Sequence, residues 1–330
     1  MGERYVVIGS NSFAGATLVS RLIADGEQVL GINRSPEGPK FFLPYTWASS
    51  KKNYEFFQAD LNKDLDRIGQ KLKTFKPTVV IDLAGQGMVA ESWLNPAEWY
   101  LTNIVAKAKL HEILKSIDSL NSYIRVSTPE VYGSQEVVQP ESWSLNPTTP
   151  YAVSHAAIDL SLRAQYQQYK FPVIFTRFAN FYGPAQQLYR IVPRTIIQAL
   201  TGGTLNLHGG GTSIRAFIYG EDVAGAIRVA AQKGKPGEIY HFSTDEFISI
   251  KNLVQMVCEQ LKVDPQSFVK VSPDRPGKDL AYLMSSSKAK TQLGWSAKTN
   301  LESGIRATID WVKSNLSEIK ALPQDYIHKS

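Results

Sequence analysis

A glycine-rich turn between a strand and a helix lies near the start of this chain and limits its possible folds. The run RYVVIGS (4–10) is mostly apolar, which is typical of a buried parallel strand. GSNSFAG (9–15) follows it and leads into ATLVSRLIADG (16–26), whose apolar residues recur with a helical period. Such a turn brings backbone N–H groups and the positive end of a helix to one point, where a pyrophosphate can bind.

Four residues of this turn are predicted to contact a dinucleotide. Gly9 supplies the tight turn, and Gly15 supplies the close contact between helix and strand. Ser12 stands where such turns often have a glycine, and Phe13 follows it. The turn is not a P-loop, because no Gly-Lys-Ser/Thr follows. The motif alone leaves an ordinary strand-turn-helix open as the alternative.

The length and composition exclude several classes of protein. A chain of 330 residues corresponds to about two domains. With 43% hydrophobic and 20% charged residues, it is globular and not disordered. The single cysteine, Cys258, excludes an intramolecular disulfide, and the five histidines are too scattered for a zinc site. We therefore expect no metal ion and a cytoplasmic location.

The charge pattern points to a small anionic ligand. The formal net charge is +6, but basic and acidic residues are interspersed, and the densest basic stretch, KLKTFK (71–76), is short. We expect no nucleic-acid partner. No apolar run reaches the roughly 18 residues of a membrane span, so we also expect no membrane partner.

The second predicted strand, QVLGINRS (28–35), bears on the choice of cofactor. At this place an acidic residue accepts the ribose hydroxyl of NAD, whereas a cation accommodates the extra phosphate of NADP. The strand ends in Asn33 and Arg34. Arg34 favours NADP, with NAD as the alternative, unless its side chain is only a solvated loop residue.

Further strands complete a recognisable fold class. EFFQADL (55–61) and TVVIDLAG (78–85) are apolar runs separated by helical patterns, which gives a β-α-β-α series. Right-handed crossovers then build a parallel sheet, so we predict an α/β, Rossmann-like, doubly wound sheet with a smaller α/β substrate-binding domain. The remaining predicted cofactor contacts at these strand ends are Asp60, Leu61, Leu83 and Ala84.

Candidate catalytic residues follow a later strand. YIRVSTPEVYG (123–133) predicts a buried strand that runs into a turn, so Thr128 and Glu130 lie at a carboxyl end of the sheet. Open α/β sheets bind their ligands at that edge. We expect both side chains to face a substrate, with a solvated turn carboxylate as the alternative for Glu130.

A tyrosine and a histidine begin the next predicted helix, PYAVSHAAIDLSLRAQYQQY (150–169). Tyr151 and His155 are four residues apart and therefore share one helix face. A tyrosine placed there is a candidate acid or base, although an isolated tyrosine is more often a core or interface aromatic. That both residues also contact the cofactor is implied only by a family resemblance and not by this spacing.

The order of these motifs resembles the extended short-chain dehydrogenase/reductase family, and within it the nucleotide-sugar 4,6-dehydratases of the dTDP-glucose and GDP-mannose types. The resemblance extends from about residue 4 to about residue 312. The segments that carry it are GSNSFAG, LAGQGMVAES (83–92), STPEVYG (127–133), Tyr151 with its partner His155, RFANFYGP (177–184) and DRPGKDLAY (274–282).

The resemblance implies an NAD(P)-dependent lyase that converts a nucleotide-diphosphate hexose to its 4-keto-6-deoxy form without net oxidation. In that cycle Tyr151 removes the proton from the sugar O4, Thr128 hydrogen-bonds the same oxygen, and Glu130 removes the C5 proton. The alternatives are an epimerase, reductase or decarboxylase of the same superfamily, or a catalytically impaired nucleotide-sugar-binding protein.

Two residues depart from the family pattern. Pro129 stands where dTDP-glucose-type enzymes have an aspartic acid that protonates the leaving hydroxyl, so Glu130 or another group must supply that proton. His155 stands where the family has a lysine that binds the nicotinamide ribose and lowers the pKa of the tyrosine. His155 either still orients the ribose or marks impaired catalysis, and on this basis His155→Lys is expected to raise turnover or cofactor retention.

The resemblance also predicts substrate contacts, domains and assembly. A Rossmann domain of 1–178 plus 214–245 would bind the cofactor, and 179–213 plus 246–330 would bind the nucleotide sugar. A homodimer would form through helices near 97–116 and 151–169. The predicted substrate contacts are Gln86, Ser92, Thr128, Asn180, Arg215 and Arg275, with the two arginines on the phosphates.

Overall fold

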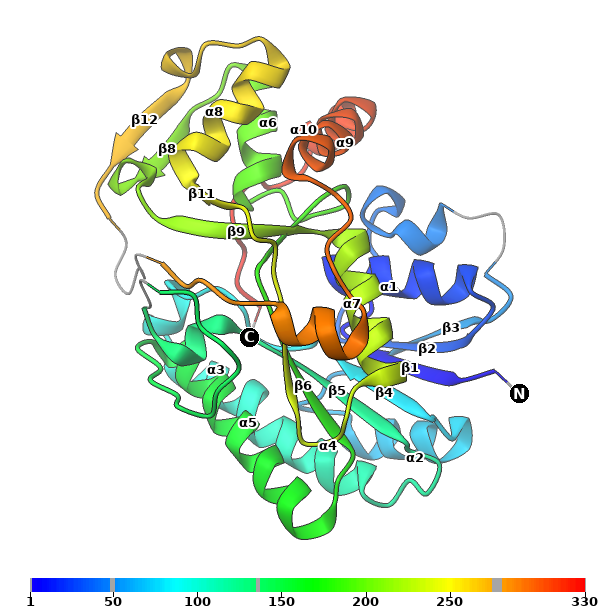
Figure 1. Ribbon diagram of the computed structural model, residues 1–330. Coiled ribbons are helices and arrows are strands. Elements are labelled where there is room, and N and C mark those ends of the chain that lie inside the picture. Colours follow the sequence, from blue (N-terminus) through cyan, green and yellow to red (C-terminus); the bar gives the residue numbers. More distant parts are fainter. Residues whose placement is uncertain (1, 48–50, 135–136, 275–280, 330) are drawn as a thin grey trace.

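A parallel sheet forms the centre of the larger lobe (Figure 1). In this computed structural model, residues 2–47, 51–134, 137–274 and 281–329 are described. Within them, the sheet has seven strands in the order β10-β6-β5-β4-β1-β2-β3. The predicted Rossmann-like α/β fold is therefore confirmed. The strands of this sheet are β1 (Arg4–Ile8), β2 (Gln28–Asn33), β3 (Tyr54–Gln58), β4 (Val79–Asp82), β5 (Ser122–Ser127), β6 (Val173–Phe178) and β10 (Ile239–Phe242).

Side chains of β1 alternate between two core layers. Tyr5 and Val7 pack on the face covered by α1 and α7, whereas Val6 and Ile8 pack on the face covered by α2, α4 and α5. Because both faces are buried, the strand is apolar at successive positions, which explains the continuous apolar run in the sequence. The helices of this lobe are α1 (Phe13–Ala24), α2 (Leu65–Phe75), α3 (Pro96–Tyr100), α4 (Lys107–Leu114), α5 (Pro150–Tyr169) and α7 (Gly220–Lys233).

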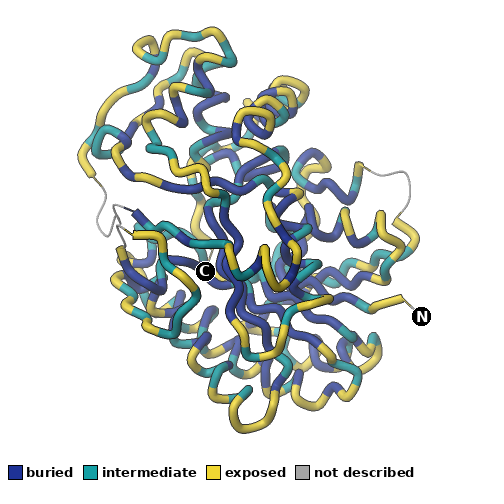
Figure 2. The backbone as a smooth tube through the Cα atoms, in the orientation of Figure 1, coloured by how far each residue is buried: buried dark blue, intermediate teal, exposed yellow. Residues whose placement is uncertain are grey.

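The distribution of burial follows these layers. Figure 2 shows the central strands buried along most of their length and the outer helices exposed on their outward side. Between α3 and α4 the helix continues through a wider turn at Leu101–Ala106. Among the described helices, none combines the length and the apolar character needed to cross a bilayer.

The smaller lobe begins where the chain leaves the main sheet after β6. Ala179 separates β6 from β7, which belongs to a different sheet. One small sheet has the order β11-β9-β7, and another pairs β12 with β8. The elements of this lobe are β7 (Asn180–Tyr182), β8 (Leu205–His208), β9 (Ile214–Tyr219), β11 (Phe247–Ser249), β12 (Val269–Ser272), α6 (Ile191–Thr201), α8 (Ile250–Leu261), α9 (Leu301–Ser314) and α10 (Leu316–Lys320).

Later segments of the chain return to the larger lobe. β10 pairs in parallel with β6, so the chain returns to the main sheet at residues 239–242. Leu293 and Trp295, which the predicted division placed in the sugar-binding domain, pack in the core beneath α1 and α7. β9 lies in the small sheet although 214–245 was predicted as part of the Rossmann domain. The division into two binding domains stays a prediction.

Candidate functional site

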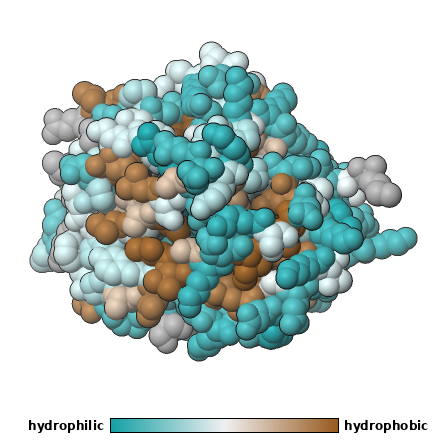
Figure 3. All heavy atoms as spheres, turned by 90° about the horizontal axis from the view of Figure 1, so that it is seen from below, coloured by the Kyte–Doolittle hydropathy of each residue, from teal (hydrophilic) through white to brown (hydrophobic). Residues whose placement is uncertain are grey.

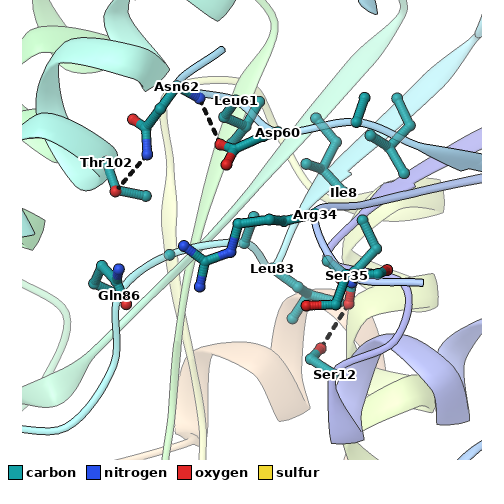
Figure 4. A pocket seen from close by; sticks show the side chains of 16 residues that line it. Ile8, Ser12, Arg34, Ser35, Asp60, Leu61, Asn62, Leu83, Gln86 and Thr102 are labelled. Carbon is teal, nitrogen blue, oxygen red and sulfur yellow. Dashed lines mark hydrogen bonds between the residues drawn. The ribbon is translucent and has the colours of Figure 1, made fainter. Parts of the chain in front are cut away.

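A cavity of about 180 Å³ lies at the carboxyl ends of β1, β2 and β4 (Figure 4). This is the edge at which open α/β sheets bind ligands. Phe13, Gly15, Tyr151 and His155 were also predicted to contact the cofactor but do not line this cavity. The predicted cofactor residues that do line it are Gly9, Ser12, Asn33, Arg34, Asp60, Leu61, Leu83 and Ala84.

The glycine-rich turn forms the wall nearest α1. Gly9 has a φ of +90°, which other residues rarely adopt, and a Cβ on Gly15 would lie 2.1 Å from the Gly9 carbonyl oxygen. The Ser12 hydroxyl donates to that carbonyl oxygen and accepts from the Gly15 amide. The turn is therefore bare backbone beside a helix N-terminus, a surface that fits a dinucleotide pyrophosphate.

Phe13 has a structural role in the same turn. Its side chain is buried, and its ring lies where a Cβ on Gly220 would approach it to 2.8 Å. Phe13 thus packs the start of α1 against the start of α7. Its predicted contact with the cofactor stays a prediction.

Arg34 reaches across the cavity from the end of β2. Figure 4 shows its guanidinium directed toward Gln86 on the opposite wall. Asn33 is held in the same turn, because its amide donates to the Ser35 carbonyl oxygen over 3.0 Å. Gln86 was predicted as a substrate contact but lines the cavity of the predicted cofactor residues.

The far end of the described chain also reaches this cavity. The Lys329 carbonyl oxygen accepts hydrogen bonds from Gln86 at 2.6 Å and from Arg34 at 3.2 Å. The Lys329 ammonium donates to the Ser35 hydroxyl. The sequence carries no signal for this contact, because the partners are between 243 and 295 residues apart.

The candidate catalytic residues meet at the start of α5. The ring centroids of Tyr151 and His155 lie 4.6 Å apart. Burial and the charge of Glu130 raise the pKa of Tyr151 well above its usual value, and a hydrogen bond with Thr128 and the charges of Arg190 and Arg125 offset only part of this rise. The structure thus brings the four predicted catalytic residues Thr128, Glu130, Tyr151 and His155 together.

An arginine of β5 lies within hydrogen-bond distance of His155. Arg125 lies 3.0 Å from the Nδ1 atom of His155, and both side chains are buried. Burial and the positive charges of Arg125 and Lys107 hold the pKa of His155 well below its usual value. His155 is therefore neutral at pH 7.

A buried ionic cluster, Asp82, Lys107, Arg125, Asp159 and Arg177, lies beneath this histidine. All five side chains are fully buried. Lys107 pairs with Asp82 at 2.7 Å, and Arg125 pairs with Asp159 at 3.0 Å. The cluster carries three cations and two carboxylates, which leaves one net positive charge. No sequence pattern indicates this cluster, because its members come from α4, α5 and three different strands.

Asn103 links the cavity to the catalytic helix. Its side chain accepts from the Gln86 amide at 2.8 Å and donates both to the Gln86 carbonyl oxygen and to the Ser154 hydroxyl. Lys107 donates to the Ala84 carbonyl oxygen in the same loop. The loop after β4 is thus fixed relative to α5, and Asn103 is a functional residue that sequence reasoning missed.

The predicted substrate contacts have different surroundings. Ser92 is fully buried, donates to the Val89 carbonyl oxygen and accepts from the Tyr151 amide, so it holds the start of α5. Tyr282 contacts two more of the predicted substrate residues, Asn180 and Arg215. Its hydroxyl donates a hydrogen bond to Asn180, and its ring centroid lies 4.0 Å from the Arg215 guanidinium. Arg275 lies outside the described residues. Contact of any of them with a substrate stays a prediction.

Comparisons with known proteins give this geometry a family. The family model described as GDP-mannose 4,6 dehydratase matches residues 6–308. A human dTDP-D-glucose 4,6-dehydratase is 32% identical, over 96% of this chain and 92% of the relative. A trifunctional UDP-glucose 4,6-dehydratase, 3,5-epimerase and reductase of Arabidopsis thaliana is 33% identical, but this chain spans only 40% of its length.

A solved structure supports the same assignment. A dTDP-glucose 4,6-dehydratase from Streptomyces venezuelae, solved with NAD bound, superposes with a TM-score of 0.88 at 27% identity. The match covers 96% of this chain and 98% of the other. With the matched residues covering most of its length, the chain belongs to the GDP-mannose 4,6 dehydratase family.

Proposed function

We propose that this protein is a nucleotide-sugar 4,6-dehydratase that converts a nucleotide-diphosphate hexose to its 4-keto-6-deoxy form. One observation carries the proposal: Tyr151, Thr128 and Glu130 meet at the sheet edge, and Asn103 ties that site to the neighbouring cavity. A nicotinamide cofactor supplies the hydride acceptor for such chemistry and returns the hydride later in the cycle.

The side chains of this chain divide the proton transfers among them. Tyr151 takes the proton from the sugar O4, and Thr128 hydrogen-bonds the same oxygen. The 4-ketone acidifies the C5 proton, which Glu130 then removes as general base. Because Pro129 has no acidic proton, Glu130 also returns its proton to the hydroxyl, which leaves from C6 as water. C5 takes up a proton again when C6 receives the hydride, so the cycle involves no net oxidation.

The direct test is product formation from a panel of nucleotide hexoses. Purified protein with added NAD or NADP should give a 4-keto-6-deoxy product that absorbs after alkali treatment. A 4-epimer instead would identify the epimerase alternative, and a pentose formed from an added nucleotide hexuronic acid would identify the decarboxylase alternative. Bound nucleotide sugar with no turnover would identify a binding protein.

NADP is the proposed cofactor form, with NAD as the alternative that the related structure contains. Arg34 at the end of β2 lines the cavity where the extra phosphate of NADP would approach, and a cation favours that phosphate. Arg34→Ala should weaken NADP binding about tenfold and leave NAD binding nearly unchanged. Equal losses for both would show that Arg34 does not select the cofactor.

Homodimer formation is proposed through α3, α4 and α5. Figure 3 views the protein from below, toward the layer that contains α4 and α5, and shows apolar atoms gathered on that face. Exposed apolar residues are Leu94 just before α3, Leu101 and Val105 in the wider turn between α3 and α4, and Val153 and Leu160 in α5. Exposed apolar residues gathered in this way fit a second copy of the chain. Analytical ultracentrifugation of the purified protein tests whether it forms a dimer.

The cytoplasmic location stays a prediction.

A further inference from the structure

The family lysine is absent at position 155, yet a cation lies directly beneath that position. Arg125 is within hydrogen-bond distance of His155, and the two residues come from β5 and α5. A guanidinium has donors and no acceptors. The Nδ1 atom of His155 must therefore accept, so the proton of the neutral ring is on Nε2.

The orientation of Arg125 is fixed by two further hydrogen bonds, and one of its partners is itself held in place. Its Nε donates to Asp159 at 3.0 Å, and a terminal nitrogen donates to the Val126 carbonyl oxygen at 2.8 Å. Asp159 is held in turn by the Ser127 hydroxyl at 2.6 Å. Because Asp159 follows His155 by one helical turn, the same helix positions the histidine and the partner of its arginine.

We propose that Arg125 is a positioning residue that replaces the family lysine through His155. Arg125 fixes the neutral Nε2–H form of His155, which presents a donor to the cofactor ribose. Arg125 also supplies the positive charge that favours the ionised form of Tyr151. The proposal deepens the proposed function and rests on it for the identity of the ligand.

Several charged groups act on this pair. Glu130, after β5, opposes ionisation of Tyr151, whereas Arg125 on β5 and Arg190 before α6 favour it. Arg125 and Lys107 on α4 both oppose a charge on His155. Within the ionic cluster, Arg125 is the cation that is bonded to His155, so its removal should affect His155 and Tyr151 together.

For His155→Lys we now expect the opposite of what the family resemblance suggested. A lysine at this place would bring a second buried cation next to Arg125, and like charges at short range disfavour both ionised forms. We expect His155→Lys alone to lower turnover. Combined with Arg125→Met, the new lysine can pair with Asp159 one turn away, so the double variant should exceed either single variant in turnover.

The first experiment uses the protein without substrate. Nitrogen-15 NMR of labelled histidine should show His155 as the neutral Nε2–H form from pH 5 to pH 9, and Arg125→Met should raise the pKa of His155. The absorbance of tyrosinate, with Tyr151→Phe as the blank, should show Tyr151 ionising at higher pH in Arg125→Met. A proton on Nδ1, or an unchanged Tyr151, would overturn the proposal.

The second experiment distinguishes a role of Arg125 in positioning His155 from a role in the stability of the fold. Arg125→Met should lower turnover about tenfold to a hundredfold and move the alkaline optimum to higher pH, while Arg125→Lys keeps most of the activity. Arg177→Met is the matched control, because Arg177 is equally buried and contacts Asp159 at 3.6 Å. It should destabilise the fold without changing the His155 proton. If no nucleotide hexose turns over, the NMR and absorbance results still decide the role of Arg125.

A second inference concerns a strap, defined as residues 324–329, which joins the two lobes. Gln324 bonds Gln198 at 2.7 Å and Asp325 pairs with Arg194 at 2.8 Å, both on α6 of the smaller lobe. Figure 1 shows the chain descending from α10 to the centre of the molecule.

On the larger lobe the strap rests on α3 and the cavity. The His328 ring stacks on Trp99 with centroids 5.1 Å apart and the planes 7° from parallel. The Lys329 carbonyl oxygen accepts hydrogen bonds from Arg34 and Gln86, which lie on opposite walls of the cavity. A dinucleotide that bonds these two side chains must displace that carbonyl.

We infer that the strap competes with the dinucleotide for this cavity and so restrains cofactor binding. Loosening it with Tyr326→Ala and His328→Ala together should raise the affinity for NAD and NADP several-fold, measured by titration calorimetry. Ile327→Ala, at an exposed position of the same segment, is the control and should leave the affinity unchanged. Equal or weaker affinity in the double variant would overturn the inference.

Discussion

The two walls of the site are built in different ways. The cofactor wall is mostly main chain: Gly9, Ser12 and Gly15 lie within seven successive residues, and glycines keep side chains out of the way. The catalytic wall is made of side chains, with Tyr151 and His155 resting on the buried ionic cluster. The first wall depends on local backbone geometry, and the second depends on charges brought together from distant parts of the chain.

The largest effect is expected on the catalytic wall, at Glu130. Glu130→Gln removes the proposed base with little change in size, so turnover should fall by about 10²- to 10⁴-fold. Binding of the nucleotide sugar should remain, as measured by calorimetry. Exchange of the C5 proton with D₂O is the decisive readout, since continued exchange in the variant would assign the base to another group.

A second test removes one cation of the ionic cluster. Lys107→Met leaves the Asp82 carboxylate without its closest partner, and breaking such a buried pair costs about 3–5 kcal/mol of unfolding free energy. Urea unfolding measures this loss. Lys109→Met, on the exposed side of the same helix, should change stability by less than about 0.5 kcal/mol. Similar losses of unfolding free energy in both variants would show that the loss in Lys107→Met does not come from breaking the ion pair with Asp82.

A third test addresses the cofactor wall. Gly15→Ala places a Cβ 2.1 Å from the Gly9 carbonyl oxygen, so the turn must open. We expect binding of NAD and NADP to weaken about a hundredfold, corresponding to about 2.7 kcal/mol. Gly225→Ala in α7, where a Cβ meets nothing within 4 Å, should leave binding intact. Normal binding in Gly15→Ala would show that the turn does not hold the phosphates.

The smallest effect concerns the pH dependence of stability. Burial lowers the pKa of His111 to about 3, whereas an unfolded histidine has a pKa near 6.5. As pH falls from 7 to 5, the unfolded chain takes up a proton that the folded chain refuses, so stability is lost. The expected loss is on the order of 2 kcal/mol for this residue. His111→Gln should reduce the slope of unfolding free energy against pH over this range, and an unchanged slope would exclude His111 as its source.

The sequence predicted the cofactor wall in more detail than the catalytic wall. The glycine spacing and the apolar run at 4–10 were sufficient for the turn, because local backbone geometry is written in successive residues. The same reading placed Thr128, Glu130 and Tyr151 together at one sheet edge, which the structure matches. It missed Asn103, since an asparagine inside an apolar helix pattern has no local signature.

For His155 the sequence was insufficient. The sequence shows that the family lysine is absent at position 155, but it does not show that Arg125 lies next to that position. Arg125 is 30 residues away and has no feature that distinguishes it from other strand residues. The boundary between β6 and β7 is a similar case. The apolar pattern runs on through both strands, and only pairing with different neighbours separates them.

By itself the sequence determined the parallel sheet, the phosphate-binding turn and the family resemblance, all of which depend on apolar period, glycine position and motif order. The tertiary structure decided which charges meet beneath Tyr151 and which distant segment covers the cavity. The physical reason is range: backbone conformation follows from neighbours along the chain, whereas the ionisation of a buried group follows from every charge that folding brings close to it.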